Sequence, residues 1–193
     1  MKLTEVCIQT FCHWHYRLCS CKIILNNSFF VCIAFMACCF QIQAATLQGK
    51  VVGVADGDTI TVLDAQKAQH KIRLQGIDAP EKAQAYGNKS KQSLHEMVHG
   101  KQVTVNYQKK DKYGRILGKV LLNGTDVCLE QLKSGMAWHY KQYAKVQSKE
   151  DQESYAQAQM TAQAQSIGLW KEKSPTPPWV FRKPTGAKIS FSW

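Results

Sequence analysis

Residues 51–62 read VVGVADGDTITV and place two acidic residues at one predicted turn. Val, Ile and Thr on both sides of Gly57 favour two β-strands, because β-branched side chains fit a pleated, half-buried surface. Residues 70–78, HKIRLQGID, alternate apolar with polar positions and predict a third strand in a meander. A neutral Asn-Gly pair would close the hairpin equally well. The acids Asp56 and Asp58 therefore need another explanation.

The following sequence predicts one barrel with helices. Apolar residues at helical spacing favour a helix within 83–100. A short second helix is expected within 127–135 and a longer polar one, rich in Ala and Gln, within 148–170, and each of the three ends near a glycine. Alternating residues favour strands over 101–108 and 115–122. This element order favours an α+β fold, a five-stranded OB-fold β-barrel with about three helices. Such barrels often bind nucleic acid, but a fold alone does not assign a function.

The two ends of the chain differ in composition from this domain, which we assign to residues 45–172. Residues 173–193 contain SPTPPWVFRKPTG and predict a proline-rich C-terminal tail, extended against the body or disordered. Residues 1–44 carry a basic start, twelve apolar residues (FFVCIAFMACCF) and small residues before a cleavage point after Ala44. We expect this segment to be a signal peptide.

The expected location of the protein is therefore secreted or periplasmic. The apolar run is shorter than the roughly 20 residues that span a bilayer. An uncleaved anchor and a lipid anchor at Cys38 or Cys39 are the alternatives, although FMAC matches a lipobox poorly. Only in those two cases do we expect a membrane partner.

Cysteine content and charge narrow the possible classes. Seven of the eight cysteines precede residue 45, which leaves Cys128 alone in the predicted domain and excludes an internal disulfide. Cys128 lies on the apolar face of a predicted helix, so we expect a buried, inert thiol. The formal net charge of +11 favours polyanionic partners such as nucleic acid, with a charge that serves only solubility as the alternative.

Four acidic residues occur in two short motifs. Asp56 and Asp58 belong to DGD, and Asp78 and Glu81 belong to IDAPE at the end of the third strand. In a meander, that strand end can return to the first turn. Carboxylates a few ångström apart raise one another's pKa unless a cation lies between them, and Ca²⁺ takes about 6–8 oxygen ligands. The motifs together indicate a hard-cation site, whereas each alone is also typical of a turn or helix start.

Two arginines follow a pattern that suits phosphate. Arg73 lies in the third strand, and the motif DKYGR places Tyr113 and Arg115 around a glycine. Planar, permanently charged guanidiniums facing the cation can hold the charge that develops on a phosphodiester during its cleavage. Tyr113 can stack on a base or bind a phosphate. A plain polar hairpin turn is the alternative for DKYGR.

The ordered set DGDT, the arginine of IRLQGIDAPE, DKYGR and GMAWHY resembles the thermonuclease family, the staphylococcal-nuclease-like secreted nucleases. The resemblance covers residues 50–170, and PTPPWVFRK is similar to the end of exported bacterial members. It implies a Ca²⁺-dependent, sugar-nonspecific endonuclease, a phosphodiesterase that cleaves DNA and RNA to 3′-phosphorylated products. It implies no stable protein partner.

The resemblance also implies roles for individual residues. Glu81 would position or deprotonate the attacking water, and two arginines would bind the scissile phosphate. The implied catalytic residues are Arg73, Glu81 and Arg115. The implied Ca²⁺ ligands are Asp58, Asp78 and the backbone carbonyl of Ala79. Asp56 would support these ligands without contacting the ion itself. The implied substrate-binding residues are Lys112, Tyr113 and either Tyr140 or Tyr143.

Two other functions would use the same fold. A non-catalytic OB-fold module that binds nucleic acid would be expected to have lost the acids or the arginines, and this chain keeps the whole set. An exported accessory protein of the cell surface or of plasmid transfer would use the nuclease fold as a scaffold.

Overall fold

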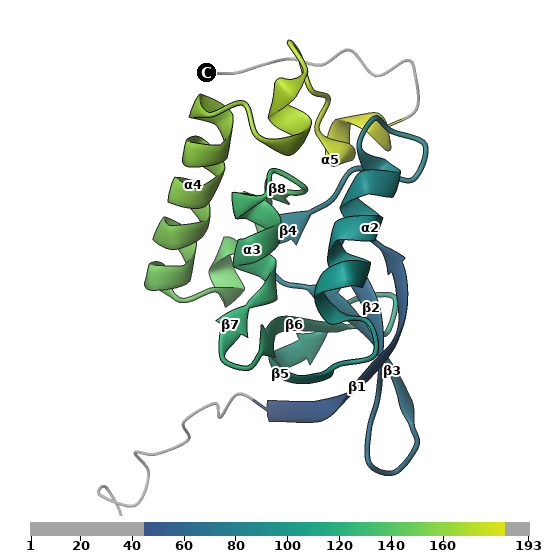
Figure 1. Cartoon of the computed structure of the whole chain (residues 1–193). Helices are drawn as coiled ribbons and strands as arrows, with labels where there is room; N and C mark the ends of the chain where they lie inside the picture. The colour runs from purple at the N-terminus through teal and green to yellow at the C-terminus, as the bar shows by residue number, and fades with distance from the viewer. Residues whose placement is uncertain (1–44, 184–193) are drawn as a thin grey trace, which may run out of the picture. The chain divides into compact units, whose positions relative to one another are not determined.

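The structure is a computed structural model that describes residues 45–183. The predicted signal peptide, residues 1–44, and the end of the predicted tail, residues 184–193, lie outside the described residues. Helices lie beside a small β-barrel in the described part (Figure 1). The barrel strands are β1 (Ala45–Asp56), β2 (Thr59–Leu63), β3 (Gln69–Leu74), β5 (Gln102–Lys110) and β6 (Ile116–Leu122).

The other elements are shorter strands and the helices. The short strands are β4 (Ile77–Asp78), β7 (Thr125–Asp126) and β8 (Trp138–His139). The α-helices are α2 (Gly87–Val98), α3 (Val127–Lys133), α4 (Lys149–Ala164) and α5 (Pro178–Phe181). The 3₁₀-helices are η1 (Lys141–Val146) and η2 (Gly168–Lys171).

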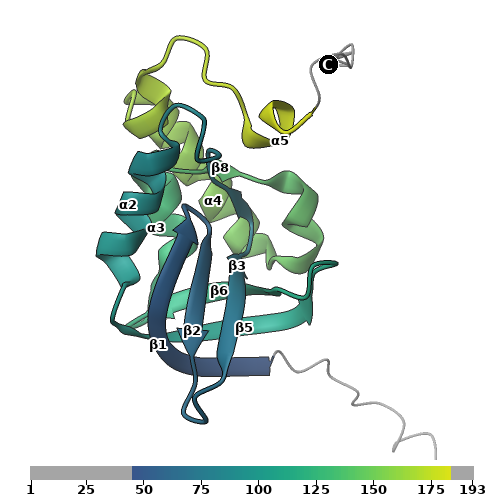
Figure 2. The same ribbon diagram turned by 90° about the vertical axis from the view of Figure 1, so that its right-hand side faces the viewer.

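Pairing between β3 and β6 closes the barrel. The strands follow the order β3-β2-β1-β5-β6 with antiparallel neighbours, and β6 returns parallel to β3 where Ile72 lies opposite Ile116. The long strand β1 serves two partners, because residues 45–50 pair with β5 and residues 50–56 pair with β2. Figure 2 shows the curvature that this double role requires. The predicted five-stranded OB-type barrel is confirmed.

Alternation along the strands fills the barrel interior. Inward positions are apolar and completely or almost completely buried, and they alternate with residues on the other face of the sheet, some of which, such as Arg73, are covered by neighbouring segments. The interior includes Val51, Ile60, Val62, Ile72, Leu74, Val105, Ile116 and Val120. Helix α2 adds Leu94 and Val98 against β1, as its helical spacing predicts. Burial of this apolar surface is the main favourable term that holds the domain together.

Local capping residues fix where the helices begin. The Asp126 side chain accepts hydrogen bonds from the backbone N–H groups of Cys128 and Leu129 at the start of α3. Ser148 does the same for Asp151 at the start of α4. Each cap satisfies N–H groups that have no partner within the helix. Cys128 itself is buried, as predicted, and burial raises the pKa of its thiol to about 12.

Two features differ from the sequence-based expectation. Strands β4 and β8 pair with each other and join Asp78 to the segment around Trp138. The sequence predicts a proline-rich tail that is extended against the body or disordered. Its described part does pack against the body, at Gln84 and Trp138, but it contains the helical turn α5, which Pro178 begins at a position where its missing N–H costs nothing. Among residues 45–183, none of the helices has the length and apolar character needed to cross a membrane.

The glycine of the Asp-Gly-Asp turn between β1 and β2 is packed closely against neighbouring elements. Gly57 is buried, and its carbonyl accepts a hydrogen bond of 2.9 Å from Nε2 of the buried Gln131 in α3. A Cβ at Gly57 would overlap Ser90 Oγ in α2 and lie 2.8 Å from the Cβ of Ala79. Glycine is needed here because the turn packs directly against α2 and the end of β4.

We therefore expect Gly57→Ala to lower the free energy of unfolding by about 1–3 kcal/mol, the usual cost of overpacking a filled site. Urea unfolding followed by circular dichroism measures this change. Gly53→Ala is the matched control, since a Cβ there would lie 3.6 Å from Thr61, an ordinary contact. Equal stability of the two variants would contradict the account of the turn.

Candidate active site

One pocket of about 410 Å³ collects most of the residues selected from the sequence. Their side chains come from the β1–β2 turn, β3, the segment after β4, the β5–β6 hairpin and the segment after β8. The predicted residues that line it are Asp56, Asp58, Arg73, Ala79, Glu81, Lys112, Tyr113, Arg115 and Tyr140. Pro80 and Arg182 complete the lining. The side chain of Tyr143 lies outside the described part of the structure.

Asp58 lies at the inner end of this pocket. Its carboxylate accepts hydrogen bonds from the Ala79 backbone N–H at 2.7 Å and from Thr59 Oγ1 at 3.0 Å. Burial raises the pKa of Asp58 to about 7, and the charge of Asp56 adds to that rise, while the charge of Arg73 opposes it. A carboxylate in this position is stabilised by any further positive charge that reaches it.

Asp56 shapes the turn through the backbone of Asp58. Its Oδ1 accepts a hydrogen bond of 3.1 Å from the backbone N–H of Asp58. The backbone carbonyl of Asp58 in turn accepts from the N–H of Leu74 at 2.8 Å. These contacts attach the turn to the end of β3, which fits a supporting position for Asp56.

Arg73 connects the two acidic motifs. Its Nη2 lies 3.0 Å from Oδ2 of Asp58 and 2.8 Å from Oδ1 of Asp78, so both carboxylates meet at one guanidinium nitrogen. Nη1 donates to the backbone carbonyl of Ile77 at 2.9 Å. Arg73 and both acids are buried. The expected meeting of Asp58 and Asp78 is therefore present, and Arg73 directs its guanidinium at the acids.

Arg115 is held by a residue that the sequence-based reasoning missed. Oδ2 of Asp111 accepts a hydrogen bond of 2.7 Å from Nε of Arg115, and Oδ1 accepts from the N–H groups of Tyr113 and Arg115. The carboxylate thus fixes both the turn and the arginine. An Asp that begins a tight turn and accepts from N–H groups two or more residues later is a known pattern, so the motif DKYGR carried this signal.

The side chains at the tip of this hairpin face solvent. Tyr113 is 71% exposed. The ring of Tyr113 lies 5.0 Å from Nζ of Lys112 and 5.5 Å from the guanidinium carbon of Arg115. An exposed aromatic ring between two cations can meet a base and its phosphate together. The arrangement fits the predicted contact of Lys112 and Tyr113 with a nucleotide.

Pairing of β4 with β8 brings Tyr140 to the pocket. The N–H of Tyr140 donates to the carbonyl of Gly76 at 2.8 Å, just beyond the strand pair. Of the two late tyrosines predicted from the sequence, Tyr140 lines the pocket. Its ring lies 5.5 Å from that of Trp179 in α5.

Arg182 enters the pocket from the tail and was not predicted. Its guanidinium contacts Asp78 and Glu81, residues about a hundred positions earlier in the chain. The proline content of the tail predicts only backbone conformation. No local pattern in residues 173–183 indicated that an arginine would reach the acids.

The donor groups present are chemically suited to a hard cation. Asp58, Asp78 and the carbonyl of Ala79 would offer oxygen atoms, the ligand type that Ca²⁺ and Mg²⁺ prefer. No group of three or more His, Cys, Asp or Glu side chains able to hold a metal ion is present among residues 45–183. A cation here would therefore need water or phosphate oxygens besides the two carboxylates, as is common for both ions.

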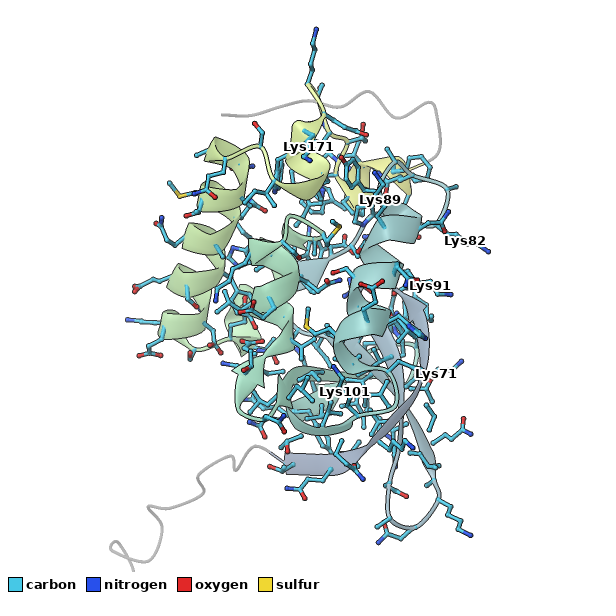
Figure 3. All side chains as sticks on the ribbon, in the orientation of Figure 1. Lys71, Lys82, Lys89, Lys91, Lys101 and Lys171 are labelled. Carbon is cyan, nitrogen blue, oxygen red and sulfur yellow. The ribbon has the colours of Figure 1, made fainter. Side chains whose placement is uncertain are left out.

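Several lysines lie on the surface of α2 and of the segments beside it. Figure 3 shows lysines projecting from α2 and from the neighbouring segments into solvent. They include Lys71, Lys82, Lys89, Lys91 and Lys101. Lys82 directly follows Glu81 of the pocket. Exposed positive charge of this kind attracts polyanions to the protein by long-range electrostatics.

Known proteins resemble this chain over most of its length. A model of the family described as "Staphylococcal nuclease homologue" matches residues 71–172. An "Uncharacterized endonuclease" of Haemophilus influenzae is 37% identical over 172 residues, which cover 89% of this chain and 91% of that protein.

Two further relatives are similar to this chain over most of their own length. An "Uncharacterized endonuclease" of Escherichia coli is 42% identical over 144 residues, 74% of this chain and 90% of the relative. A "Micrococcal nuclease" of Shigella flexneri is 34% identical over 148 residues, 72% of this chain and 82% of the relative. On the family match and the extent of these similarities, the chain belongs to the staphylococcal nuclease homologue family.

Proposed function

We propose that this nuclease is a Ca²⁺-dependent, sugar-nonspecific phosphodiesterase that cleaves both DNA and RNA. Membership of the staphylococcal nuclease homologue family and relatives named endonuclease and micrococcal nuclease support a nuclease enzyme. The observation that carries the finer proposal is the meeting of Asp58 and Asp78 at one nitrogen of Arg73. Asp58 and Arg73 line the pocket together with Glu81 and Arg115, and Asp78 is buried behind them.

The cation would be held by Asp58, Asp78 and the carbonyl oxygen of Ala79. When bound, it would supply positive charge that stabilises the phosphoryl oxygens and balances the two carboxylates. Asp56 would act on this site only through the turn, because its carboxylate accepts the N–H of Asp58.

The side chains of the chain would perform the remaining work. Glu81 accepts the proton of a water molecule as the water oxygen bonds to phosphorus and the bond from phosphorus to the 5′-oxygen breaks. Arg115, held by Asp111, contributes a fixed guanidinium to the charged phosphoryl oxygens. Because phosphate contacts carry little information about base identity, we expect little sequence preference.

Calcium dependence is tested by a Ca²⁺ titration of plasmid hydrolysis with Asp58→Ala and Asp58→Asn. We expect the half-maximal Ca²⁺ concentration to rise more than about 10-fold in both variants, since even the loss of an outer-shell partner costs metal sites about 10- to 100-fold. Asp58→Asn keeps the volume and tests the charge alone. Hydrolysis that is unchanged by EGTA would overturn the calcium requirement, and a shift of plasmid mobility without cutting would favour a binding module.

The role of Glu81 is tested by Glu81→Gln. Loss of a general base costs about 10²- to 10⁴-fold in rate, so kcat should fall within that range at saturating Ca²⁺. Glu153→Gln, in an exposed position of α4, is the control for loss of one negative charge. If Glu81→Gln keeps kcat within about 3-fold of the unchanged protein, Glu81 is not the base.

We also propose that the protein is exported, to the periplasm or the medium. Support comes only from the sequence of residues 1–44, with its basic start, apolar run and small residues before Ala45. N-terminal sequencing of protein from the cell envelope and the medium tests this. A first residue at or near Ala45 is the expected result, and intact protein found only in the cytoplasm would refute export.

A further inference from the structure

The tail carries an arginine into the acid cluster of the pocket. Nη2 of Arg182 lies 2.5 Å from Oδ2 of Asp78, and Nη1 lies 3.2 Å from Oδ1 of the same carboxylate. Nη1 also donates to Oε1 of Glu81 at 2.6 Å. One guanidinium thus binds the predicted metal ligand with both nitrogens and the predicted general base with one. These hydrogen bonds between oppositely charged groups are of the strong kind.

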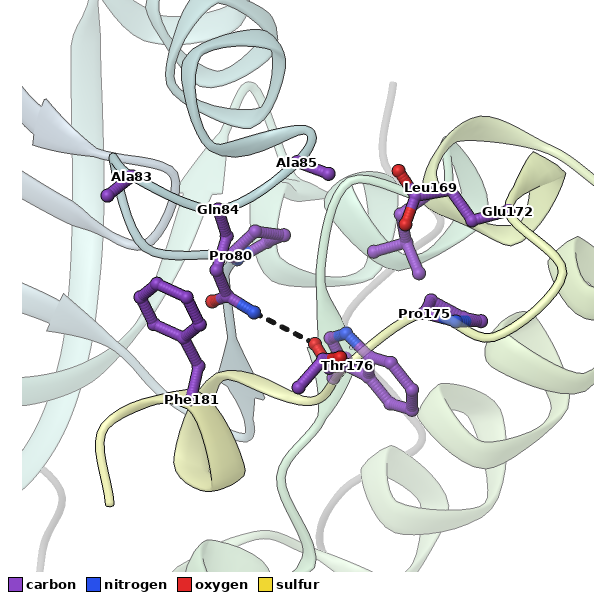
Figure 4. A pocket seen from close by; sticks show the side chains of 10 residues that line it. Pro80, Ala83, Gln84, Ala85, Leu169, Glu172, Pro175, Thr176 and Phe181 are labelled. Carbon is purple, nitrogen blue, oxygen red and sulfur yellow. Dashed lines mark hydrogen bonds between the residues drawn. The ribbon is translucent and has the colours of Figure 1, made fainter. Parts of the chain in front are cut away.

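Packing of the tail against the body holds Arg182 beside the two acids. The ring of Trp179 in α5 lies 5.6 Å from that of Trp138 and 5.5 Å from that of Tyr140. Nε2 of Gln84, three residues after Glu81, donates to the carbonyl of Thr176 at 2.9 Å. Figure 4 shows this hydrogen bond across a small pocket between the two segments. We call residues 175–182 the C-terminal strap, because these contacts attach it both to the segment after Glu81 and to the segment around β8.

The contacts of Arg182 occupy the oxygens that a cation would use. The side chain of Asp78 is 1% exposed, and its Oδ1 already accepts a hydrogen bond from Arg73. With Arg182 on both oxygens, no face of this carboxylate is left to solvent. A divalent cation at Asp78 would also lie beside a permanently charged guanidinium, and like charges at that distance repel strongly.

Arg182 can also move away from Asp78 and Glu81. Its side chain is 44% exposed, whereas that of Arg73 is 7% exposed. Arg73 is further fixed by backbone carbonyls of β3 and β4. Displacing Arg182 therefore returns its guanidinium to water at the edge of the pocket. Displacing Arg73 from Asp58 and Asp78 would instead leave its guanidinium buried without a carboxylate partner.

We propose that Arg182 is a tethered counter-ion that competes with the divalent cation for Asp78 and Glu81, so that the C-terminal strap sets the cation concentration at which the enzyme works. This inference rests on the proposed cation site. It makes the strap part of the active site: Arg182 neutralises the acids until a cation replaces it, and its departure frees Glu81 to accept a proton.

The test compares Arg182→Gln with Lys183→Gln by calorimetric titration of Ca²⁺ into the protein without nucleic acid. The two variants lose the same charge at adjacent exposed positions. Coupling between two sites typically changes affinity by about 5- to 150-fold. We expect Arg182→Gln to bind Ca²⁺ at least about 5-fold more tightly than the unchanged protein, and Lys183→Gln to match the unchanged protein.

Thermal unfolding gives a second readout. In EDTA, Arg182→Gln should melt at a lower temperature than Lys183→Gln, because Asp78 and Glu81 lose the guanidinium that they share. With saturating Ca²⁺ the difference should shrink. Arg182→Lys should lie between the two in both measurements, since an ammonium cannot bind Asp78 with two nitrogens.

Failure of this inference can be told apart from failure of the cation site. If Asp58→Ala abolishes Ca²⁺ binding but Arg182→Gln leaves the affinity unchanged or weaker, competition by the strap is wrong and the site stands. If the unchanged protein shows no saturable Ca²⁺ binding that depends on Asp58, both proposals are wrong.

Discussion

The guanidinium of Arg73 is the contact on which the arrangement of the pocket depends. It joins the turn that follows β1 to the end of β4 by pairing with Asp58 and Asp78 through one nitrogen. Its position follows from the barrel, because register pairs Thr59 with Arg73 and so places the arginine beside the turn. Removing one member of a buried ion pair leaves an uncompensated charge, which is strongly destabilising. The same strand pairing therefore builds the fold and gathers the acids.

Charges of opposite sign alternate through this cluster, and that alternation lets a basic protein concentrate acids in one place. Asp58 meets Arg73, Arg73 meets Asp78, Asp78 meets Arg182, and Arg182 meets Glu81. Each carboxylate has a cationic neighbour, which offsets the repulsion expected among them. A neutral Asn-Gly turn in place of Asp-Gly-Asp would remove Asp58, the first member of the series. Asp58 thus belongs to a network that reaches as far as the tail, and Asp56 joins it only through the backbone N–H of Asp58.

Regular periodicity made most of the fold predictable, and its absence explains what was missed. Alternation in residues 51–62 and 70–78 predicted the meander, and the DGD and IDAPE motifs predicted that Asp58 and Asp78 meet. Strands β4 and β8 have two residues each, too few to show a period, so their pairing could not be read from the sequence. Arg182 lies 101 residues from Glu81, and long-range contacts of single side chains leave no local pattern.

Cys128 has a consequence for how the molecule responds to its surroundings. Thiol–disulfide exchange proceeds through the thiolate, and a buried thiol with a pKa raised to about 12 supplies almost none of it at neutral pH. It is the one free thiol of residues 45–183. The barrel domain consequently needs neither an oxidant nor a disulfide isomerase to fold. Reductants have no disulfide to break within it. Its architecture is indifferent to the redox poise of the compartment that holds it.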